Sequence, residues 1–340
     1  MTTLPAALAM AIDRQLEGVS RSGLGQQAAS LSQRYRQRAG NHAADEESLA
    51  YAVTRLPATY AAMRAVLAEL EERAPDFAPA TLLDLGSGPG TAAWAALDAF
   101  PGLNAIDLVE RAGSFRTLGR TLARNADPVV ADATWHDLDL ERPDALAALA
   151  GPYDLVTLGF SLVEIAPERR PDLLRRAWEL TAGVLVLVDP GTPEGHGRML
   201  AARDLLLGEG TAMLAPCPGA VACPIVAPDW CHTAVRLPRR RDHRLAKGAA
   251  MGFEDEKYAY MVLGRPELGH AAAARILRPP ESDKIGVRAA LCTEIGAGIA
   301  TIPARARPDF KAAKKWRWGQ GFDDMALVNG RLEKPRPGGA

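Results

Sequence analysis

The spacing of hydrophobic positions along the chain changes at about residue 76. Before that point, apolar residues recur every three or four positions over 4–16 and 49–70, as in amphipathic helices. The Arg-rich stretch 33–38 lies between these two segments. We therefore predict an N-terminal helical region over residues 1–75.

Short apolar runs then alternate with longer helical patterns. The runs predict buried strands at 81–86, 104–110, 128–131, 153–158 and 183–189. Helices are expected between them, near 90–100, 112–124, 142–150 and 167–181, with one more at 191–208. Because strands and helices that alternate in this way form right-handed crossovers, we predict an α/β, Rossmann-like domain with a parallel sheet over residues 76–210.

Regular patterning ends near residue 211. Five prolines and three of the four cysteines of the chain fall within 211–255, and prolines at this density disfavour a helix or a central strand. We predict a proline- and cysteine-rich insert that a metal centre, and not a hydrophobic core, holds together. Over 256–340 we expect a strand at 257–265 that returns to the main sheet, a small β-unit at 287–292 and 298–303, and a basic tail that frays from residue 331.

Composition narrows the class of protein. The chain has 340 residues, 48% hydrophobic and 24% charged, which excludes disordered, collagen-like and disulfide-framework proteins. The first 19 residues lack a signal-peptide pattern, and no apolar run approaches the roughly 18 residues of a membrane span. We expect a cytoplasmic protein with reduced thiols, no membrane partner and a monomeric state.

The charge is unevenly distributed. The whole chain has 40 basic and 41 acidic residues, but the part from Thr211 to the end has 21 basic and 13 acidic residues. The part before it has 19 and 28, and every lysine lies from Lys247 onward. This asymmetry favours a basic part that binds a polyanion such as nucleic acid; two domains with uneven surface charge are the alternative.

A glycine-rich loop follows the first predicted strand. Asp84 precedes Gly86, Gly88 and Gly90, which allow a sharp turn and close approach of a ligand to the backbone. Thr91 stands where a dinucleotide fingerprint has its third glycine, so nicotinamide and flavin cofactors are disfavoured. Asp84 instead suits a cofactor with an ammonium group.

Two more acidic residues follow predicted strands. Glu110 ends the second strand, 20 residues after Gly90, where a carboxylate accepts hydrogen bonds from both ribose hydroxyls. Asp132, just past the third predicted strand, is placed to meet an adenine amino group. In this order the loop and acidic residues resemble the class I S-adenosylmethionine-dependent methyltransferase fold, although a fold retained without a cofactor is also possible.

The sequence assigns no catalytic residue. Residues 157–162 lack the Asn/Asp-Pro-Pro-aromatic signature of amine methylation, and no cysteine precedes Cys217 to serve pyrimidine C5 methylation. Glu164, Asp189 and His196 lie near the carboxyl edge of the predicted sheet and are candidate bases. The sequence shows no partner that would set the protonation state of any of them, so a strand-end or helix-capping role is the preferred interpretation of each.

The four cysteines have the spacing of a metal site. Cys217, Cys223 and Cys231 are separated by five and seven residues, and Cys292 follows later. A disulfide conflicts with the expected reducing compartment, and zinc knuckles have shorter spacings. Cysteine followed by proline is common beside iron–sulfur clusters, so a [4Fe–4S] cluster is favoured, with zinc as the alternative and His232 as a substitute ligand.

Two basic groups follow the cysteines. They are Arg236, Arg239, Arg240, Arg241, Arg244 and Lys247, and then Lys311, Lys314, Lys315 and Arg317 with Trp316 and Trp318. Cations that neutralise phosphates beside stacking aromatics suit irregular RNA. We predict RNA contact through Arg239, Arg240, Arg241, Lys314, Lys315, Trp316 and Trp318; solvated charges and core tryptophans are the alternative.

Several of these segments together resemble the Rsm22 family. They are 51–60, the glycine loop, 188–193, the cysteine block with Trp230-Cys231-His232, the run 254–260, 278–280, Cys292 and 312–319. The family comprises methyltransferase-like proteins of the small ribosomal subunit, bacterial and mitochondrial. The resemblance implies S-adenosylmethionine binding, a [4Fe–4S] cluster on the four cysteines, and action on small-subunit ribosomal RNA in assembly or translation. It leaves open an enzyme or a non-catalytic assembly factor.

Overall fold

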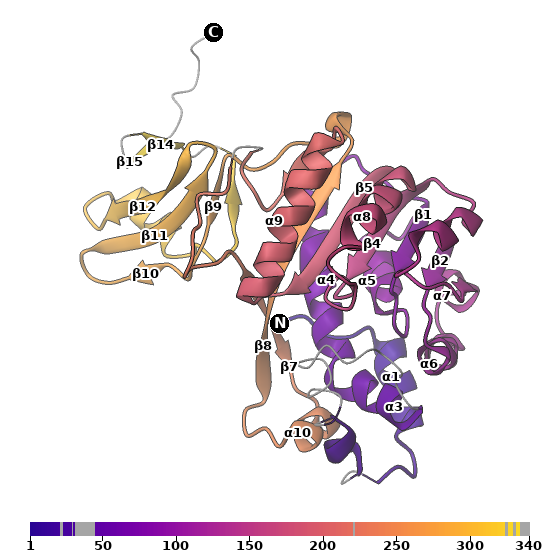
Figure 1. The fold of residues 1–340 in the computed structure, drawn as a ribbon. Coiled ribbons are helices and arrows are strands. Elements are labelled where there is room, and N and C mark those ends of the chain that lie inside the picture. The colour runs from indigo at the N-terminus through magenta and orange to yellow at the C-terminus, as the bar shows by residue number, and fades with distance from the viewer. Residues whose placement is uncertain are drawn as a thin grey trace.

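A mostly parallel sheet forms the centre of the molecule (Figure 1). The computed structural model describes residues 1–20, 23–28, 30, 45–219, 222–323, 326–328 and 331–333. The strand order is β3-β2-β1-β4-β5-β8-β6, and β7 pairs with the other end of β8. The parallel strands are β1 (Thr81–Leu85), β2 (Ala105–Val109), β3 (Thr134–His136), β4 (Tyr153–Gly159) and β5 (Thr181–Pro190). The antiparallel strands are β6 (Ala212–Ala215), β7 (Thr233–Pro238) and β8 (Phe253–Gly264).

Helices cover both faces of this sheet, so the predicted Rossmann-like α/β fold is confirmed. Successive residues of β1 illustrate the two layers, because Leu82 and Leu83 are both fully buried but belong to different hydrophobic clusters. The first cluster holds side chains of α4 (Leu56–Arg73) and α5 (Thr91–Ala99), and the second those of α8 (Arg170–Glu179) and α9 (Pro193–Gly208). The strands therefore read as continuous apolar runs.

The N-terminal region is helical where the structure describes it, as predicted. It contains α1 (Ala6–Gln15), α3 (Asp45–Thr54) and α4. The predicted helix over 49–70 consists of two helices. The helix is interrupted at Arg55, directly before α4 begins with Leu56 and Pro57. The Arg-rich stretch 33–38 lies outside the described residues.

The predicted third strand at 128–131 is wrong. These residues form a short helix, α7 (Pro128–Ala131), and the third strand is β3. The Asp127 side chain accepts a hydrogen bond from the Val129 N–H at 3.0 Å, and Pro128 occupies the first helical turn. Asp followed by Pro is a helix-start signal that outweighs a short apolar run. The remaining helical elements of this domain are α6 (Gly113–Ala123) and a 3₁₀ turn, η1 (Pro143–Ala148).

The proline-rich insert is more regular than predicted. It contains β6, β7 and the short helix α10 (Arg241–Lys247), and the longest stretch of it without regular structure, where it is described, is 216–232. The prolines fit this arrangement, because β6 stops before Pro216 and β7 ends at Pro238. Among the described strands, β6 and β7 each pair with β8 alone. Their opposite edges therefore do not need the backbone N–H groups that prolines lack.

A second, smaller sheet follows β8 and lies beside the main sheet (Figure 1). It consists of β9 (Ala274–Ile276), β10 (Glu281–Ser282), β11 (Gly286–Thr293), β12 (Gly296–Pro303) and β13 (Gly321–Phe322). After β8 comes a 3₁₀ turn, η2 (Pro266–Leu268), and α11 (Arg307–Ala313) follows β12. β14 (Ala326–Val328) pairs with β15 (Arg331–Glu333), so the chain remains ordered slightly beyond the predicted point of fraying. Within the described ranges, no helix has both the length and the apolar character required to cross a bilayer.

The carboxylate of Glu254 connects β8 to α10. Lys247 donates to it at 2.8 Å, Arg239 lies 2.9 Å away and His243 lies 3.6 Å away. Burial disfavours the charge of Glu254, but these three neighbours together hold its pKa well below the ordinary value. The ionised form is thus tied into the fold.

We predict that Glu254→Gln lowers the free energy of unfolding at pH 7 by about 1–3 kcal/mol, because it removes a charged hydrogen-bond acceptor. Since the folded pKa is depressed, this stability is present above the unfolded pKa of about 4.3 and is lost as pH falls below it. Urea unfolding at pH 7 and pH 3.5 should show the difference from wild type shrinking at the lower pH. The exposed Glu267→Gln is the control, and an unchanged difference at both pH values would contradict the prediction.

Candidate cofactor pocket and cysteine site

The glycine loop turns back against the end of β2. The N–H groups of Gly86 and Ser87 both donate to the Val109 carbonyl at 2.9 Å. Gly86, Gly88 and Gly90 have φ values of 75°, 54° and 80°, in the left-handed region. A Cβ on Gly86 would lie 2.6 Å from the Ser161 Cβ, so only glycine fits there.

Glu110 closes this loop from the end of β2. Its Oε2 accepts from the Gly88 N–H at 2.9 Å, and its Oε1 accepts from the Ala112 N–H at 2.7 Å. Burial raises the pKa of Glu110, although these two N–H groups favour its charged form. Glu110 therefore lies against the glycine loop, and its carboxylate keeps lone pairs for a ligand.

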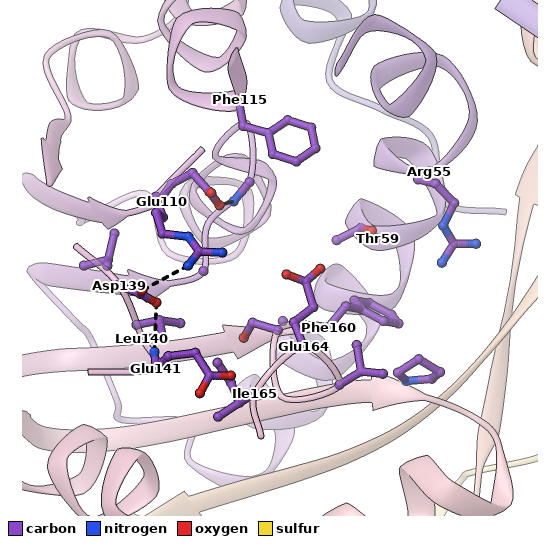
Figure 2. Close-up of a pocket in the computed structure, with 18 of the residues that line it drawn as sticks. Arg55, Thr59, Glu110, Phe115, Asp139, Leu140, Glu141, Phe160, Glu164 and Ile165 are labelled. Atoms are coloured by element: carbon purple, nitrogen blue, oxygen red, sulfur yellow. Dashed lines mark hydrogen bonds and ion pairs between the residues drawn. The ribbon is translucent and has the colours of Figure 1, made fainter. Parts of the chain in front are cut away.

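A cavity of about 720 Å³ opens beside the loop (Figure 2). Gly86, Gly88 and Glu110 line one part of it, and Pro190 and Thr192, after β5, line another. It therefore crosses the carboxyl ends of the parallel strands, where open α/β sheets bind their ligands. Its size suits a nucleoside-sized cofactor together with part of a second molecule.

Asp84 supports the cavity from beneath. Its side chain is 2% exposed, accepts a hydrogen bond from the Thr157 hydroxyl at 2.7 Å, and does not line the cavity. Burial, with a smaller contribution from Glu110, raises the pKa of Asp84 to about 7 even though the Thr157 hydrogen bond opposes it. Contact with an ammonium group would require a water between the two.

Gly90 and Asp132 also lie outside the cavity lining. Gly90 precedes α5, and a Cβ there would touch Leu108 and Trp135 at 3.4 and 3.5 Å. Asp132 is exposed after α7, because the strand it was expected to follow is that helix. Two acidic residues that follow the true third strand line the cavity, Asp139 and Glu141.

Several lining residues come from distant segments, and no motif in the sequence assigned them to a cofactor site. Tyr51, Arg55 and Thr59 reach the cavity from the N-terminal helices. Phe160 lines it from the end of β4, and among the described residues it alone has a positive φ without being glycine, at 60°. The family-like segment 51–60 was the only hint of the first three.

The three candidate bases predicted from the sequence lie in different surroundings. Glu164 lines the cavity, and Figure 2 shows its carboxylate pointing inward. Asp189 is fully buried and paired with Arg198 at 2.5 Å, which marks it as structural. His196 lies on α9 and faces a different cavity, which the cysteines line. Of the three, Glu164 is positioned to meet a ligand.

The structure brings all four cysteines together. Cys217, Cys223, Cys231 and Cys292 line a second cavity of about 60 Å³, with His196 and His232 in the same wall. None is in a disulfide. Throughout the part of the chain that the structure describes, no three thiol, imidazole or carboxylate side chains converge tightly enough to hold a single metal ion.

Burial raises the pKa of three of these thiols, those of Cys217, Cys231 and Cys292. It raises the pKa of Cys231 and of Cys292 to about 12, and repulsion from the neighbouring cysteines contributes to both shifts. Arg203 and Arg275 act in the opposite direction, because their charges favour the thiolate of Cys217. The cavity thus contains four sulfur donors and, beside them, cations that would offset thiolate charge.

Arg275 anchors the cysteine loop to the rest of the protein. It is 3% exposed and lies on β9, where its guanidinium donates to the carbonyls of Pro216 and Gly319 and to the carboxylate of Glu69 on α4. Pro216 directly precedes Cys217. One buried side chain therefore fixes the position of the first cysteine relative to α4.

Aromatic side chains cover the outside of the cysteine loop. His232 stacks on Trp230 with ring centroids 5.1 Å apart and meets the edge of Trp318 at 5.0 Å. Trp230 also donates from its indole N–H to the Gly191 carbonyl at 3.0 Å, next to the first cavity. These contacts give Trp318 and His232 a packing role.

The two basic groups have different surroundings. In the first, Arg239 pairs with Glu254 and Arg240 pairs with Asp13, so their charges are largely offset within the protein. In the second, Lys314, Lys315 and Arg317 are exposed after α11, whereas Trp316 packs on the hydrophobic cluster of the small sheet. The second group therefore has exposed cations without the ion pairs of Arg239 and Arg240 in the described residues, and Trp316 packs within the small sheet.

The fold and the first cavity together define a protein of the class I S-adenosylmethionine-dependent methyltransferase type. The sequence profile described as "Mitochondrial small ribosomal subunit Rsm22" matches residues 45–323, most of the chain, so this protein belongs to the Rsm22 family.

Two kinds of curated relative are similar to this chain. The human mitochondrial ribosome assembly protein METTL17 is 28% identical over 288 residues, which cover 80% of this chain and 61% of the human protein. The mitochondrial Rsm22-cox11 tandem protein 2 of Schizosaccharomyces pombe is 29% identical over 201 residues, which cover 53% of this chain and 26% of that protein. This chain therefore spans less than two thirds of either relative.

Solved methyltransferases resemble the chain only weakly. A putative RNA methyltransferase from Pyrococcus horikoshii gives 15% identity and a TM-score of 0.38, covering 59% of this chain and 81% of that one. The magnesium protoporphyrin IX methyltransferase of Synechocystis PCC 6803 gives 12% and 0.40, covering 68% and 90%. Nothing about chemistry follows from likenesses of this size.

Proposed function

We propose that this protein is an S-adenosylmethionine-binding, iron–sulfur assembly factor of the small ribosomal subunit. The observation that carries the proposal is the junction between the Gly88 N–H and the Glu110 carboxylate at the mouth of a 720 Å³ cavity. Family membership, and the name of the human relative as a ribosome assembly protein, support the ribosomal part.

The residues around the junction fit this cofactor. A Cβ on Gly88 would meet only the Tyr51 hydroxyl, at 3.9 Å, so the backbone is open toward the cavity. Glu110 would accept hydrogen bonds from the ribose hydroxyls, and Asp139 stands nearby for the adenine end. When bound, the cofactor supplies a methyl group on a sulfonium, whose positive charge suits an acidic cavity.

We predict that Gly88→Asp weakens binding of S-adenosylmethionine by at least about tenfold, a loss of roughly 1.4 kcal/mol. The new carboxylate would enter the open side of the loop and repel Glu110. Isothermal titration calorimetry on the folded variant provides the measurement.

Gly210→Asp is the matched control for this substitution. Gly210 also has a positive φ, 83°, and open space around it, but it lies away from the cavity. If wild type and Gly88→Asp bind S-adenosylmethionine with equal affinity, or if neither binds it, the proposed cofactor site is wrong.

The cysteine site fits an iron–sulfur cluster better than zinc. Four thiolates around one zinc ion stand about 3.8 Å apart, since each Zn–S bond is about 2.3 Å in a tetrahedron. The four thiols line one cavity, and the preference for a four-iron cube rests on the open spacing of the cysteines and on the prolines that follow Cys217 and Cys223. Arg203 and Arg275 would offset its negative charge.

We predict that protein purified or reconstituted without oxygen is brown, absorbs broadly near about 400 nm and holds about four irons per chain. Cys231→Ser should lose most of this absorption and destabilise the loop 216–232, because ligand binding and folding are coupled. Metal analysis and visible spectra provide the test. If the protein is colourless and holds one zinc ion per chain, the prediction of a cluster is wrong and the site binds zinc.

Docking on the small subunit is proposed to use the exposed cations after α11. Lys314, Lys315 and Arg317 are all solvent-exposed, and Lys314 also lies 4.6 Å over the Phe310 ring. Such cations neutralise phosphates and release counterions, which makes binding salt-dependent.

We predict that reversing Lys314, Lys315 and Arg317 to Glu strongly weakens co-sedimentation with small subunits and lowers its salt slope by about one unit per lost phosphate contact. Arg241→Glu with Arg244→Glu is the control, because both arginines are exposed on α10. If the control pair has the larger effect, the docking surface lies around α10.

A non-catalytic assembly factor with the same fold is the second candidate. The observation that favours it is the sequence after β4, which lacks the known signature of base amine methylation, together with the absence of any cysteine before Cys217. Cofactor binding and docking would persist in such a protein without methyl transfer.

A further inference from the structure

His196 lies in the wall of the cysteine cavity, and its role there rests on the proposed iron–sulfur function. It shares the cavity with Cys217, Cys223, Cys231 and Cys292 and is itself only 7% exposed. Within the part of the chain that the structure describes, its Nε2 atom is buried and has no hydrogen-bond partner. Because a buried polar nitrogen without a partner costs free energy, it indicates a group that binds beside it.

The first turn of α9 fixes the position of this ring. The Thr192 hydroxyl accepts from the Gly195 N–H at 3.1 Å, and the Thr192 carbonyl accepts from the His196 N–H at 2.9 Å. A Cβ on Gly195 would lie only 1.9 Å from the Pro190 carbonyl oxygen, so the turn packs directly against the end of β5. The imidazole therefore enters the cavity from a rigid element.

The ring of His196 is neutral at pH 7. Burial lowers its pKa from the ordinary value of 6.5, although the negative charge of Asp229 opposes this shift. A neutral imidazole carries one N–H group. With the proton on Nε2, the ring is a hydrogen-bond donor toward the cavity.

Sulfur is the acceptor that this cavity offers. No carboxylate or carboxamide side chain is among its described lining residues, whereas four cysteines are. The other histidine of the wall, His232, is already engaged. Its Nδ1 donates to the Trp230 carbonyl at 3.3 Å, and its ring stacks on the Trp230 indole. Of the two histidines, His196 is thus the one whose nitrogen can meet a group held by the cysteines.

We propose that His196 is a positioning residue of the cysteine site, whose Nε2 N–H donates to a sulfur atom of the cluster or of one of its cysteine ligands. Hydrogen bonds to these sulfurs are among the features that set the reduction potential of an iron–sulfur cluster. A donor stabilises the reduced form more than the oxidised form, because reduction adds negative charge to the acceptor. His196 therefore raises the potential without binding iron.

The main experiment measures the midpoint potential of the cluster in full-length protein, by anaerobic titration with dithionite in the presence of redox dyes. We expect dithionite to reduce the wild-type cluster. His196→Leu should shift the reduction equilibrium about tenfold toward the oxidised form, which lowers a one-electron potential by about 59 mV. His196→Gln should recover at least half of this shift, because its amide restores an N–H donor.

His243→Leu is the matched control for the potential. His243 is also a buried histidine on a helix, but it lines a different cavity, away from the cysteines. The folded control should therefore have the wild-type potential.

A spectroscopic measurement gives a result even if a variant fails to take up the cluster. Wild-type protein labelled with ¹⁵N-histidine is reduced, and pulsed EPR then detects histidine nitrogens that couple to the unpaired electron. We expect a coupling that is too weak for an iron ligand. It should disappear in His196→Gln and persist in His232→Phe, which keeps an aromatic ring beside Trp230 and Trp318.

The outcomes separate this inference from the proposed function. An unchanged potential in His196→Leu, equal shifts in the leucine and glutamine variants, or a wild-type cluster that dithionite does not reduce would overturn the inference and leave the iron–sulfur assembly factor standing. The absence of a weak histidine coupling in the reduced wild type, or its persistence in His196→Gln, would do the same. Wild-type protein without a cluster would overturn both.

Discussion

The buried guanidinium of Arg275 connects three parts of the chain that are distant in sequence. It reaches Glu69 on α4, the Pro216 carbonyl at the start of the cysteine loop and the Gly319 carbonyl after α11. Removing one partner of such a buried pair costs about 3–5 kcal/mol, because the other charge is left uncompensated. The position of the cysteine loop against the methyltransferase-type sheet therefore depends on this side chain.

Helix α9 gives the two cavities a common wall. Glu194 and Arg198 on its first turns face the cofactor cavity, whereas His196, Met199 and Arg203 face the cysteine cavity. The Trp230 indole reaches the same region through the Gly191 carbonyl. Residues of one helix therefore line both cavities, so the cysteine cavity and the first cavity are directly connected through α9.

Charge is divided between the two working surfaces. The charged residues among the described lining of the cavity are five carboxylates and three arginines, whereas the exposed charged residues directly after α11 are two lysines and an arginine. A polyanion would be attracted to the second surface more than to the first.

The sequence by itself determined the elements that depend on local pattern. The alternating apolar runs located β1, β2, β4 and β5, and the spacing of glycines and Glu110 located the cofactor loop, because a sharp turn and a strand end are local requirements. The run at 128–131 was misread because an Asp-Pro helix start competes with a strand pattern over so few residues.

The tertiary structure alone decided which side chains meet. Tyr51, Arg55 and Thr59 join Glu164 at the cavity although they lie more than 100 residues before it, and Arg239 and Arg240 meet Glu254 and Asp13 from other elements. Similarly, Cys292 reaches the other three cysteines only through the pairing of β11 with β9. Such contacts follow from how strands and helices pack over long sequence separations, and no local pattern of residues encodes them.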